Sequence, residues 1–340
     1  MRSAEVYARL SSAGGRAADS AAAAALIAGG QPTTIRRVSK VISGVATMWS
    51  PARLGDMSGQ RIIVTGATNG VGLATATALA RAGAHVILAV RNLELGAQRA
   101  AEMGGDTSVV RLDLADQSSV RAFPGLVDGD VDVLINNAGQ VAQHRSDTVD
   151  GFEITLGTNF LGPFALTNLM FGRVRSKIVN VGSDAHKSAS LAFDDLHLRS
   201  RRWSSFPAYA RSKLAVMLWG LELDRRLRTA GSPVTTYLTH PGWVSSNLAK
   251  VSDTALMTRV HSAVTAVANV IGNDIDAGAA PTLYCLTEPI PPGSYVGIAG
   301  RLGFKGPPTL SGRAPVACDY ADAQRLWEFA ERETGTTLPA

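Results

Sequence analysis

A short strand, a glycine-rich turn and a helix follow one another from residue 61, and this unit constrains the fold more than any other feature. Residues 61–65 form a β-branched run typical of a buried strand, an apolar helical pattern covers 73–82, and a second buried strand is predicted at 86–90. The turn needs glycine because its backbone must approach an anion at the helix N-terminus, where N–H groups and the helix dipole favour negative charge. The turn residues expected to contact a bound nucleotide are Gly66, Ala67, Thr68, Asn69, Gly70, Val71 and Gly72.

The composition excludes several other classes of protein. Of the 340 residues, 46% are hydrophobic and 18% are charged, which supplies a core and rules out wholesale disorder. Two cysteines, Cys285 and Cys318, cannot build a disulfide framework, and no apolar run reaches the roughly 18–20 residues that span a bilayer. The six histidines show no metal-ligand spacing, so no metal is expected. Residues 1–56 carry +4 of the net charge of +5, so the basic balance does not indicate nucleic-acid binding by the rest of the chain.

The first 55 residues differ from the rest and are expected to form an N-terminal extension. Residues 1–32 are rich in Ala, Ser and Gly and are predicted to be mostly disordered. Residues 33–49 carry apolar side chains at helical spacing beside three basic ones, which predicts an amphipathic helix. This helix could contact a membrane surface or a partner, or pack on its own domain. Alternatively, translation starts at Met48 or Met57, or the segment is an Arg-bearing transit peptide. We favour packing on the domain or an upstream extension over a membrane role.

Two further motifs follow later strands. Asp113 and Leu114 come after a strand at 109–112, and Asn-Asn-Ala-Gly at 136–139 comes after a buried strand at 131–135. Together with the spacing T-G-x-x-x-G-x-G of the first turn, these motifs resemble the short-chain dehydrogenase/reductase family. The resemblance implies that Asp113 and Leu114 lie beside the adenine, and that small residues let the backbone pass close under the cofactor. The implied contacts of the second motif are Asn136, Asn137, Ala138 and Gly139.

The end of the second strand predicts which cofactor is bound. An acidic residue there would hydrogen-bond the ribose 2′-hydroxyl of NAD. This chain instead has Val90 followed by Arg91, whose guanidinium can pair with a 2′-phosphate. We therefore expect NADP(H) in preference to NAD(H). The alternative is that Arg91 is an ordinary solvated surface charge.

The catalytic residues of the family are matched in order. Asn159 falls in an N-x-x-G motif, Ser183 follows a strand at 177–181, and Tyr209 and Lys213 form Y-x-x-x-K. The last two lie at i and i+4 on one helical face. A neighbouring ammonium lowers the pKa of a phenol, which is about 10 when unperturbed. The resemblance implies that Tyr209 is the acid/base and that Ser183 hydrogen-bonds the carbonyl oxygen of the substrate. It also implies that Lys213 lowers the Tyr209 pKa and binds the nicotinamide ribose, and that Asn159 supports a water relay.

Several details resemble the retinol dehydrogenase-like branch of that family. The catalytic serine and tyrosine are separated by a long insertion that contains Ala185-His186, and a His-Pro-Gly segment begins at His240. Most members of the branch have Ser-Ser where this chain has Gly182-Ser183, which still keeps the second hydroxyl. The resemblance implies a lid over the substrate around 247–275, whose apolar face suggests a lipophilic substrate. It also implies cofactor contacts from Val244 and Ser246.

These observations predict an α/β fold, a Rossmann-type doubly wound parallel sheet in a three-layer α/β/α arrangement, as a single domain over 56–335. The expected function is NADP-dependent interconversion of a lipophilic alcohol and an aldehyde or ketone. One alternative is an NADP-binding regulatory or scaffold protein without turnover, which has no need of the phenol of Tyr209. Another is a C=C reducer similar to protochlorophyllide reductase, which the positions of the two cysteines disfavour. We expect a cytoplasmic protein, with peripheral membrane contact as an alternative, and the family admits homo-oligomers.

Overall fold

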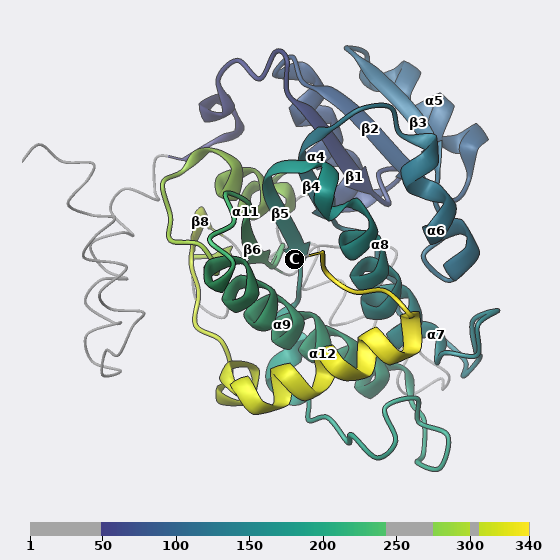
Figure 1. Cartoon of the computed structure of the whole chain (residues 1–340). Helices are drawn as coiled ribbons and strands as arrows, with labels where there is room; N and C mark the ends of the chain where they lie inside the picture. The colour runs from purple at the N-terminus through teal and green to yellow at the C-terminus, as the bar shows by residue number, and fades with distance from the viewer. Residues whose placement is uncertain (1–48, 243–274, 300–305, 340) are drawn as a thin grey trace, which may run out of the picture.

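The structure is a computed structural model that describes residues 49–242, 275–299 and 306–339. Within these residues, an eight-stranded sheet has the order β3-β2-β1-β4-β5-β6-β7-β8 (Figure 1). Neighbouring strands from β3 to β7 are parallel, and β8 is antiparallel to β7. The strands are β1 (Arg61–Thr65), β2 (His85–Val90), β3 (Thr107–Arg111), β4 (Val131–Asn136), β5 (Val174–Val181), β6 (Thr235–Thr239), β7 (Tyr295–Ile298) and β8 (Pro308–Leu310).

Helices cover both faces of this sheet, because successive side chains of a buried strand point to opposite sides. Ile62 and Val64 of β1 join the core under α4 and α11, whereas Ile63 joins the core under α6, α8 and α9. The predicted three-layer, doubly wound α/β fold in a single domain is therefore confirmed (Figure 1). The helices are α4 (Gly70–Arg81), α5 (Leu93–Met103), α6 (Gln117–Leu126), α7 (Ile154–Leu156), α8 (Gly162–Met170), α9 (Ser205–Thr229), α11 (Ile275–Thr287) and α12 (Tyr320–Thr334).

The strand order reverses between β1 and β4. From β1 the chain proceeds outward through β2 to β3, and from β4 it proceeds the other way to β7. In open parallel sheets of this kind, ligands bind beyond the carboxyl ends of the strands where the order reverses. The turn that begins at Gly66 and the segment that begins at Asn137 both leave the sheet at this place.

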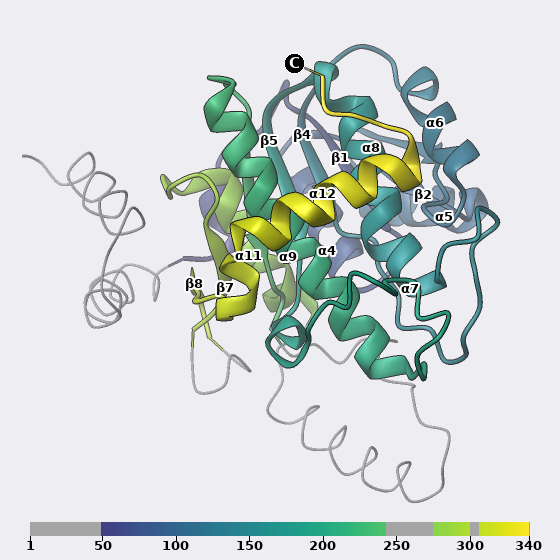
Figure 2. The same ribbon diagram turned by 60° about the horizontal axis from the view of Figure 1, so that its bottom comes forward.

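The C-terminal helix α12 lies across α9 and α8 on one face of the molecule (Figure 2). The ring of Trp327 in α12 is 4.9 Å from that of Phe164 in α8, in an edge-to-face arrangement. The guanidinium of Arg226 in α9 lies 4.3 Å from the centre of the Trp327 ring. This helix completes the layer that covers the α8 and α9 side of the sheet.

Residues 49–54, part of the expected N-terminal extension, pack against α11. The side chain of Trp49 is buried, its ring is 5.9 Å from that of Tyr284, and its Nε1 donates a hydrogen bond to Thr287 Oγ1 at 3.4 Å. Leu54 of η1 (Pro51–Leu54) is also buried. The other expectations for the extension lie in residues 1–48, outside the described residues, as do Val244, Ser246 and the expected lid up to 274.

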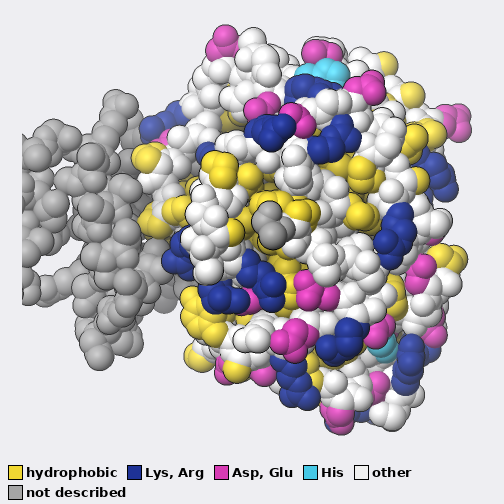
Figure 3. All heavy atoms as spheres, viewed as in Figure 1, with side chains coloured by type: hydrophobic (Ala, Val, Ile, Leu, Met, Phe, Trp, Pro, Cys, Tyr) yellow, Lys and Arg dark blue, Asp and Glu magenta, His cyan; other side chains and the backbone are white. Residues whose placement is uncertain are grey.

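On the face shown in Figure 3, basic and acidic side chains are interspersed. The view shows no field of one sign among the described residues, in keeping with the near balance of charges after residue 56. None of the described helices is both long enough and apolar enough to cross a bilayer.

Candidate active site

The glycine turn after β1 is packed so closely that side chains do not fit. A Cβ on Gly66, whose φ is +68°, would lie 2.9 Å from the Cα and Cβ of Ala138. A Cβ on Gly72 would lie 2.3 Å from Asn137 Nδ2 and 2.5 Å from the carbonyl oxygen of Gly66. Two of the three glycines are therefore required by the contact between this turn and the segment after β4.

The Asn-Asn-Ala-Gly segment is hydrogen-bonded to Thr65, the last residue of β1. The backbone N–H groups of Asn137 and Ala138 both donate to Thr65 Oγ1 at 3.0 Å, and Asn137 Nδ2 donates to the Thr65 carbonyl at 2.9 Å. Asn136 points elsewhere, because its Nδ2 donates to Thr167 Oγ1 and to Asn180 Oδ1, both at 2.9 Å. Asn137 therefore ties the segment after β4 to the end of β1, and Asn136 ties β4 to β5 and α8.

The first turn of α4 suits the diphosphate of a dinucleotide. Asn69 precedes the helix in extended backbone and makes no side-chain cap hydrogen bond, and the first turn contains no acidic residue. Gly70 has φ of +54°, and a Cβ there would meet nothing within 4 Å. Among the described residues, the positive end of the helix dipole therefore has free space beside Gly70, which fits an anionic group.

Basic side chains lie beyond β2 and β3. Arg91 is exposed at the end of β2, and Arg111 Nη1 donates to the Arg91 carbonyl at 3.3 Å. Arg99 of α5 donates from Nε to the carbonyl of Thr68, inside the glycine turn, at 3.3 Å. The sequence analysis did not single out Arg99 of α5 or Arg111 of β3, because no motif marks an arginine that reaches back to the backbone of a loop.

Asp113 and Leu114 follow β3 as predicted. Asp113 Oδ1 accepts a hydrogen bond from the backbone N–H of Ala115 at 3.0 Å, while its own N–H donates to Ser119 Oγ at 2.9 Å. Leu114 is buried, and a Cβ on Gly162 would lie 2.3 Å from its carbonyl oxygen. The pair therefore forms a tight corner where α8 approaches the end of β3.

Ser183 and Tyr209 meet at the carboxyl end of β5. Ser183 precedes the short helix η4 (Asp184–Ser188), and Tyr209 lies in the first turns of α9. Their side chains are hydrogen-bonded to each other, and Ser183 Oγ also accepts from the N–H of Ala185 at 3.2 Å. Burial raises the pKa of Tyr209, and the hydrogen bond with Ser183 acts in the opposite direction.

Lys213 lies one turn further along α9 and is buried. Its Nζ donates to the carbonyl of Val181 at 2.8 Å and is 5.8 Å from the centre of the Tyr209 ring. Burial lowers the pKa of Lys213 to about 8. Lys213 Nζ therefore lies between the Val181 carbonyl and the Tyr209 ring, and its effect on the Tyr209 pKa stays a prediction.

Asn159 lies in a π-helical turn, η2 (Gly157–Leu161), between α7 and α8. Its Oδ1 accepts from the N–H of Gln140 at 2.8 Å, and its Nδ2 donates to the Gln140 carbonyl and to Ser212 Oγ, both at 2.9 Å. A Cβ on Gly139 would lie 3.3 Å from Asn159 Oδ1 and 3.5 Å from Lys213 Nζ. Three motifs far apart in the sequence therefore converge at Gly139, and Gln140 and Ser212 are additional partners that the motifs did not reveal.

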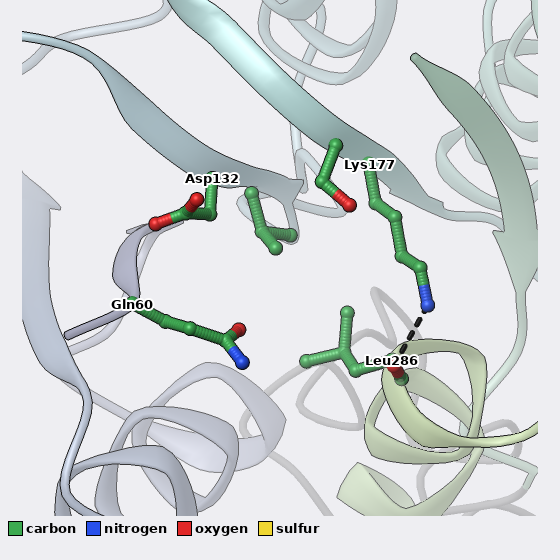
Figure 4. A pocket seen from close by; sticks show the side chains of 6 residues that line it. Gln60, Asp132, Lys177 and Leu286 are labelled. Atoms are coloured by element: carbon green, nitrogen blue, oxygen red, sulfur yellow. Dashed lines mark hydrogen bonds between the residues drawn. The ribbon is translucent and has the colours of Figure 1, made fainter. Parts of the chain in front are cut away.

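A separate hollow of about 270 Å³ lies at the amino ends of β1, β4 and β5, on the opposite edge of the sheet (Figure 4). Asp132 and Gln60 line it together with Lys177, whose Nζ donates to the Leu286 carbonyl at 2.7 Å at the end of α11. Asp132 accepts a hydrogen bond from the N–H of Arg61 at 2.8 Å. Asp132 and Lys177 are thus bonded to backbone groups around them, and the candidate active site is the carboxyl end of the sheet, where the motif residues meet.

Comparison with known proteins agrees with this assignment. The family described as short chain dehydrogenase matches residues 60–256. The chain is 34% identical to human retinol dehydrogenase 13 over 304 residues, covering 83% of this chain and 86% of that protein. It is 37% identical to human retinol dehydrogenase 12 over 290 residues, covering 81% and 86% of the two chains. The crystal structure of an uncharacterised protein from Mycobacterium paratuberculosis superposes with a TM-score of 0.74 at 42% identity, covering 86% of this chain and 99% of that one.

The family match and the retinol dehydrogenase relatives agree with the motifs at the carboxyl-end cleft. Members of this family use NAD(P) cofactors and act on small molecules that carry a CH–OH group. The chain belongs to the short-chain dehydrogenase/reductase family, in its retinol dehydrogenase-like branch, and is an oxidoreductase that interconverts alcohols and carbonyl compounds.

Proposed function

We propose that the protein is an NADP(H)-dependent oxidoreductase of lipophilic alcohols and carbonyl compounds in which Tyr209 is the acid/base. The observation that carries this proposal is the hydrogen-bonded pair of Ser183 and Tyr209, with the buried ammonium of Lys213 one helical turn away. Lys213 lies beside Gly139, in the segment that packs against the glycine turn, as the reacting group and the cofactor require.

When bound, the nicotinamide cofactor supplies the hydride in reduction and accepts it in oxidation. The phenol of Tyr209 then has to give a proton to the forming alkoxide, and burial favours this role because it raises the pKa of Tyr209 and keeps the hydroxyl protonated. Ser183 Oγ already accepts the N–H of Ala185, so its own proton is oriented by that bond toward Tyr209 or a carbonyl oxygen. Oxidation of the alcohol is the microscopic reverse.

Lys213 and Asn159 support the proton transfer. The ammonium of Lys213, close to the Tyr209 ring, favours negative charge on the tyrosine after the proton has left. The π-helical turn places the carboxamide of Asn159 against the backbone of Gln140, next to Lys213. We propose that this arrangement connects Lys213 with solvent and returns the proton to Tyr209.

The preference for NADP(H) rests on charge. Arg91 and Arg111 lie at the ends of β2 and β3, where the 2′ position of the adenosine ribose is held in folds of this kind. Val90 stands where an acidic residue would favour NAD, so no carboxylate at that strand end repels a phosphate. A planar guanidinium binds phosphate through two parallel hydrogen bonds.

The proposal of a lipophilic substrate rests on two observations. Two relatives are named for retinol, an apolar alcohol. In this chain, Phe206 in the first turn of α9 is 59% exposed and stands three residues before Tyr209, so the two lie on neighbouring positions of one helical face. An exposed aromatic side chain at this place would contact an apolar group attached to the reacting carbonyl.

The direct test is NADPH oxidation, followed by absorbance, with retinal and a series of aliphatic aldehydes of increasing length. The proposal predicts that kcat/KM rises with the length of the apolar chain and that Ser183→Ala lowers kcat by about 100-fold or more. Equal rates with NADH would contradict the cofactor assignment, and full activity of Ser183→Ala would contradict the assigned site.

A further inference from the structure

The carboxylate of Asp184, the residue directly after the catalytic serine, contacts the side chains of three other residues. Its Oδ1 accepts a hydrogen bond from the hydroxyl of Tyr295 at 3.0 Å and lies 2.8 Å from Lys187 Nζ. His240 Nε2 approaches the same oxygen at 3.7 Å. Tyr295 begins β7 and His240 directly follows β6, so one carboxylate links the turn after β5 to two neighbouring strands.

Tyr295 is held rigidly in this cluster. Its side chain is buried, and its ring lies 5.6 Å from that of His186 and 5.2 Å from that of His240. A Cβ on Gly182 would lie 3.9 Å from Cε2 of the same ring, so the ring also packs beside the backbone that leads into the serine. Burial raises the pKa of Tyr295 well above its ordinary value, so the hydroxyl stays protonated and donates to Asp184.

His240 is neutral and has a defined tautomer. Burial lowers its pKa to about 4, and its Nδ1 accepts a hydrogen bond from the N–H of Gly242 at 3.2 Å. The ring proton therefore sits on Nε2, which faces the carboxylate of Asp184. Since the ring carries no charge at neutral pH, this contact orients Asp184 and adds no full ion pair.

The backbone of Ser183 is held from the other side by His186. The carbonyl of Ser183 accepts from the N–H of His186 at 3.2 Å and from its ring Nδ1 at 2.7 Å. The Nε2 of the same fully buried ring accepts from the N–H of Ala314 at 3.2 Å. The direction of the Ser183 hydroxyl is therefore set by the turn 184–188, which is anchored at both Asp184 and His186.

We propose that Asp184 is a positioning residue for Ser183. By holding the turn 184–188 against Tyr295 and His240, it keeps Ser183 Oγ in hydrogen-bonding position with Tyr209. The structure assigns it no contact with the reacting atoms. This role rests on the proposed function of Ser183 and Tyr209, and it adds a determinant of catalysis that the motifs of the sequence do not mark.

The test compares Asp184→Ala, Asp184→Asn and Tyr295→Phe with the control Tyr284→Phe. Tyr284 is buried to the same degree as Tyr295, at 5% against 3% exposure, but lies in α11 against Trp49. We expect kcat to fall about 10- to 100-fold in Asp184→Ala, because small misplacements of a catalytic group have effects of that size. The affinity for NADPH, measured by fluorescence titration, should stay within about twofold, since the phosphate-binding turn is on another strand.

The conservative variants sharpen this test. Asp184→Asn keeps an oxygen that can accept from Tyr295, so its kcat should recover part of the loss, and Tyr295→Phe should fall between Asp184→Asn and Asp184→Ala. Tyr284→Phe should keep the wild-type kcat. Wild-type kcat in Asp184→Ala, or a parallel loss of kcat and NADPH affinity in all four variants, would overturn the positioning role.

A measurement that does not depend on enzyme activity tests the positioning role separately from the proposed function. Hydrogen–deuterium exchange of a peptide covering residues 183–189 should be faster in Asp184→Ala than in the wild type, and unchanged in Tyr284→Phe. Unchanged exchange in Asp184→Ala would overturn the inference even if the enzyme is active. If neither wild type nor variants reduce any carbonyl compound, the proposed function fails while the exchange result still decides whether Asp184 holds the turn.

Discussion

Asn137 donates two hydrogen bonds to Thr65, one from its backbone N–H to Oγ1 and one from its side chain to the carbonyl oxygen. The ends of β1 and β4 are thereby joined at the place where the strand order reverses. The glycine turn lies directly above this junction, so the geometry of the cofactor cleft depends on contacts between the protein's own loops as well as on contacts with a bound dinucleotide.

The first prediction concerns that junction. In Gly72→Ala the new Cβ would fall 2.3 Å from Asn137 Nδ2, so Asn137 has to move away from Thr65. We expect a loss of about 1–3 kcal/mol in the free energy of unfolding, as overpacked sites show. NADPH affinity should also fall. The control is Gly172→Ala, where a Cβ would meet nothing within 4 Å. Urea denaturation and NADPH titration of both variants check the prediction, and equal behaviour of the two would contradict it.

Arg91 should set the preference for NADP(H). Replacing it in Arg91→Asp puts a carboxylate where a 2′-phosphate would be bound, and we expect kcat/KM for NADPH to fall about 100-fold while that for NADH changes little or rises. Arg332→Asp makes the same charge change at an exposed position of α12. If kcat/KM for NADPH falls equally in both variants, the change in net charge causes the loss, and the assignment of Arg91 is wrong.

The buried ammonium of Lys213 predicts a pH dependence of stability. Its pKa is about 8 in the folded protein, against about 10.4 in an unfolded chain. Between these values the unfolded state binds a proton that the folded state does not, so this group adds stability as the pH rises. From about pH 7 to about pH 9.5 the wild type should gain roughly 2 kcal/mol relative to Lys213→Met. The lost hydrogen bond to the Val181 carbonyl affects both pH values equally, so parallel pH curves for the two proteins would refute the prediction.

Trp49 should be part of the folded domain. Its buried ring contacts Tyr284, so Trp49→Ala is expected to lower the free energy of unfolding by about 3 kcal/mol. The exposed aromatic Phe206 provides the comparison, because Phe206→Ala should change stability by less than about 0.5 kcal/mol. Thermal and urea unfolding distinguish the two, and an unaffected Trp49→Ala would mean that residues 49–54 contribute nothing to the domain.

The sequence predicted the parts of this protein that depend on local patterns. The β-branched runs, the glycine spacing and the i, i+4 pair Tyr209 and Lys213 each lie within one or two elements, and strand periodicity assigned them to the sheet and its flanking helices correctly. Parallel strands bring their carboxyl ends to one edge, which explains why motifs spread along the chain meet there.

Long-range side-chain contacts could not be predicted in the same way. The hydrogen bond between Asp184 and Tyr295 joins residues 111 positions apart, and no spacing in the sequence indicates that the two side chains meet. The docking of Trp49 on α11 likewise depends on packing that periodicity does not encode. The pKa of Tyr209 was predicted from Lys213 and an oxidised nicotinamide. Local sequence patterns do not reveal the burial of the phenol, which raises its pKa in the structure.

The measurement that tests the central claim most directly compares the wild type with Tyr209→Phe in two assays on the same preparations. One assay follows NADPH oxidation with a lipophilic aldehyde, and the other measures NADPH binding by fluorescence titration. The account predicts that Tyr209→Phe loses about 100- to 10,000-fold in kcat, the contribution expected of a positioned proton donor, while it binds NADPH as the wild type does. Turnover by Tyr209→Phe at the wild-type rate would contradict the assignment of Tyr209 as the acid/base.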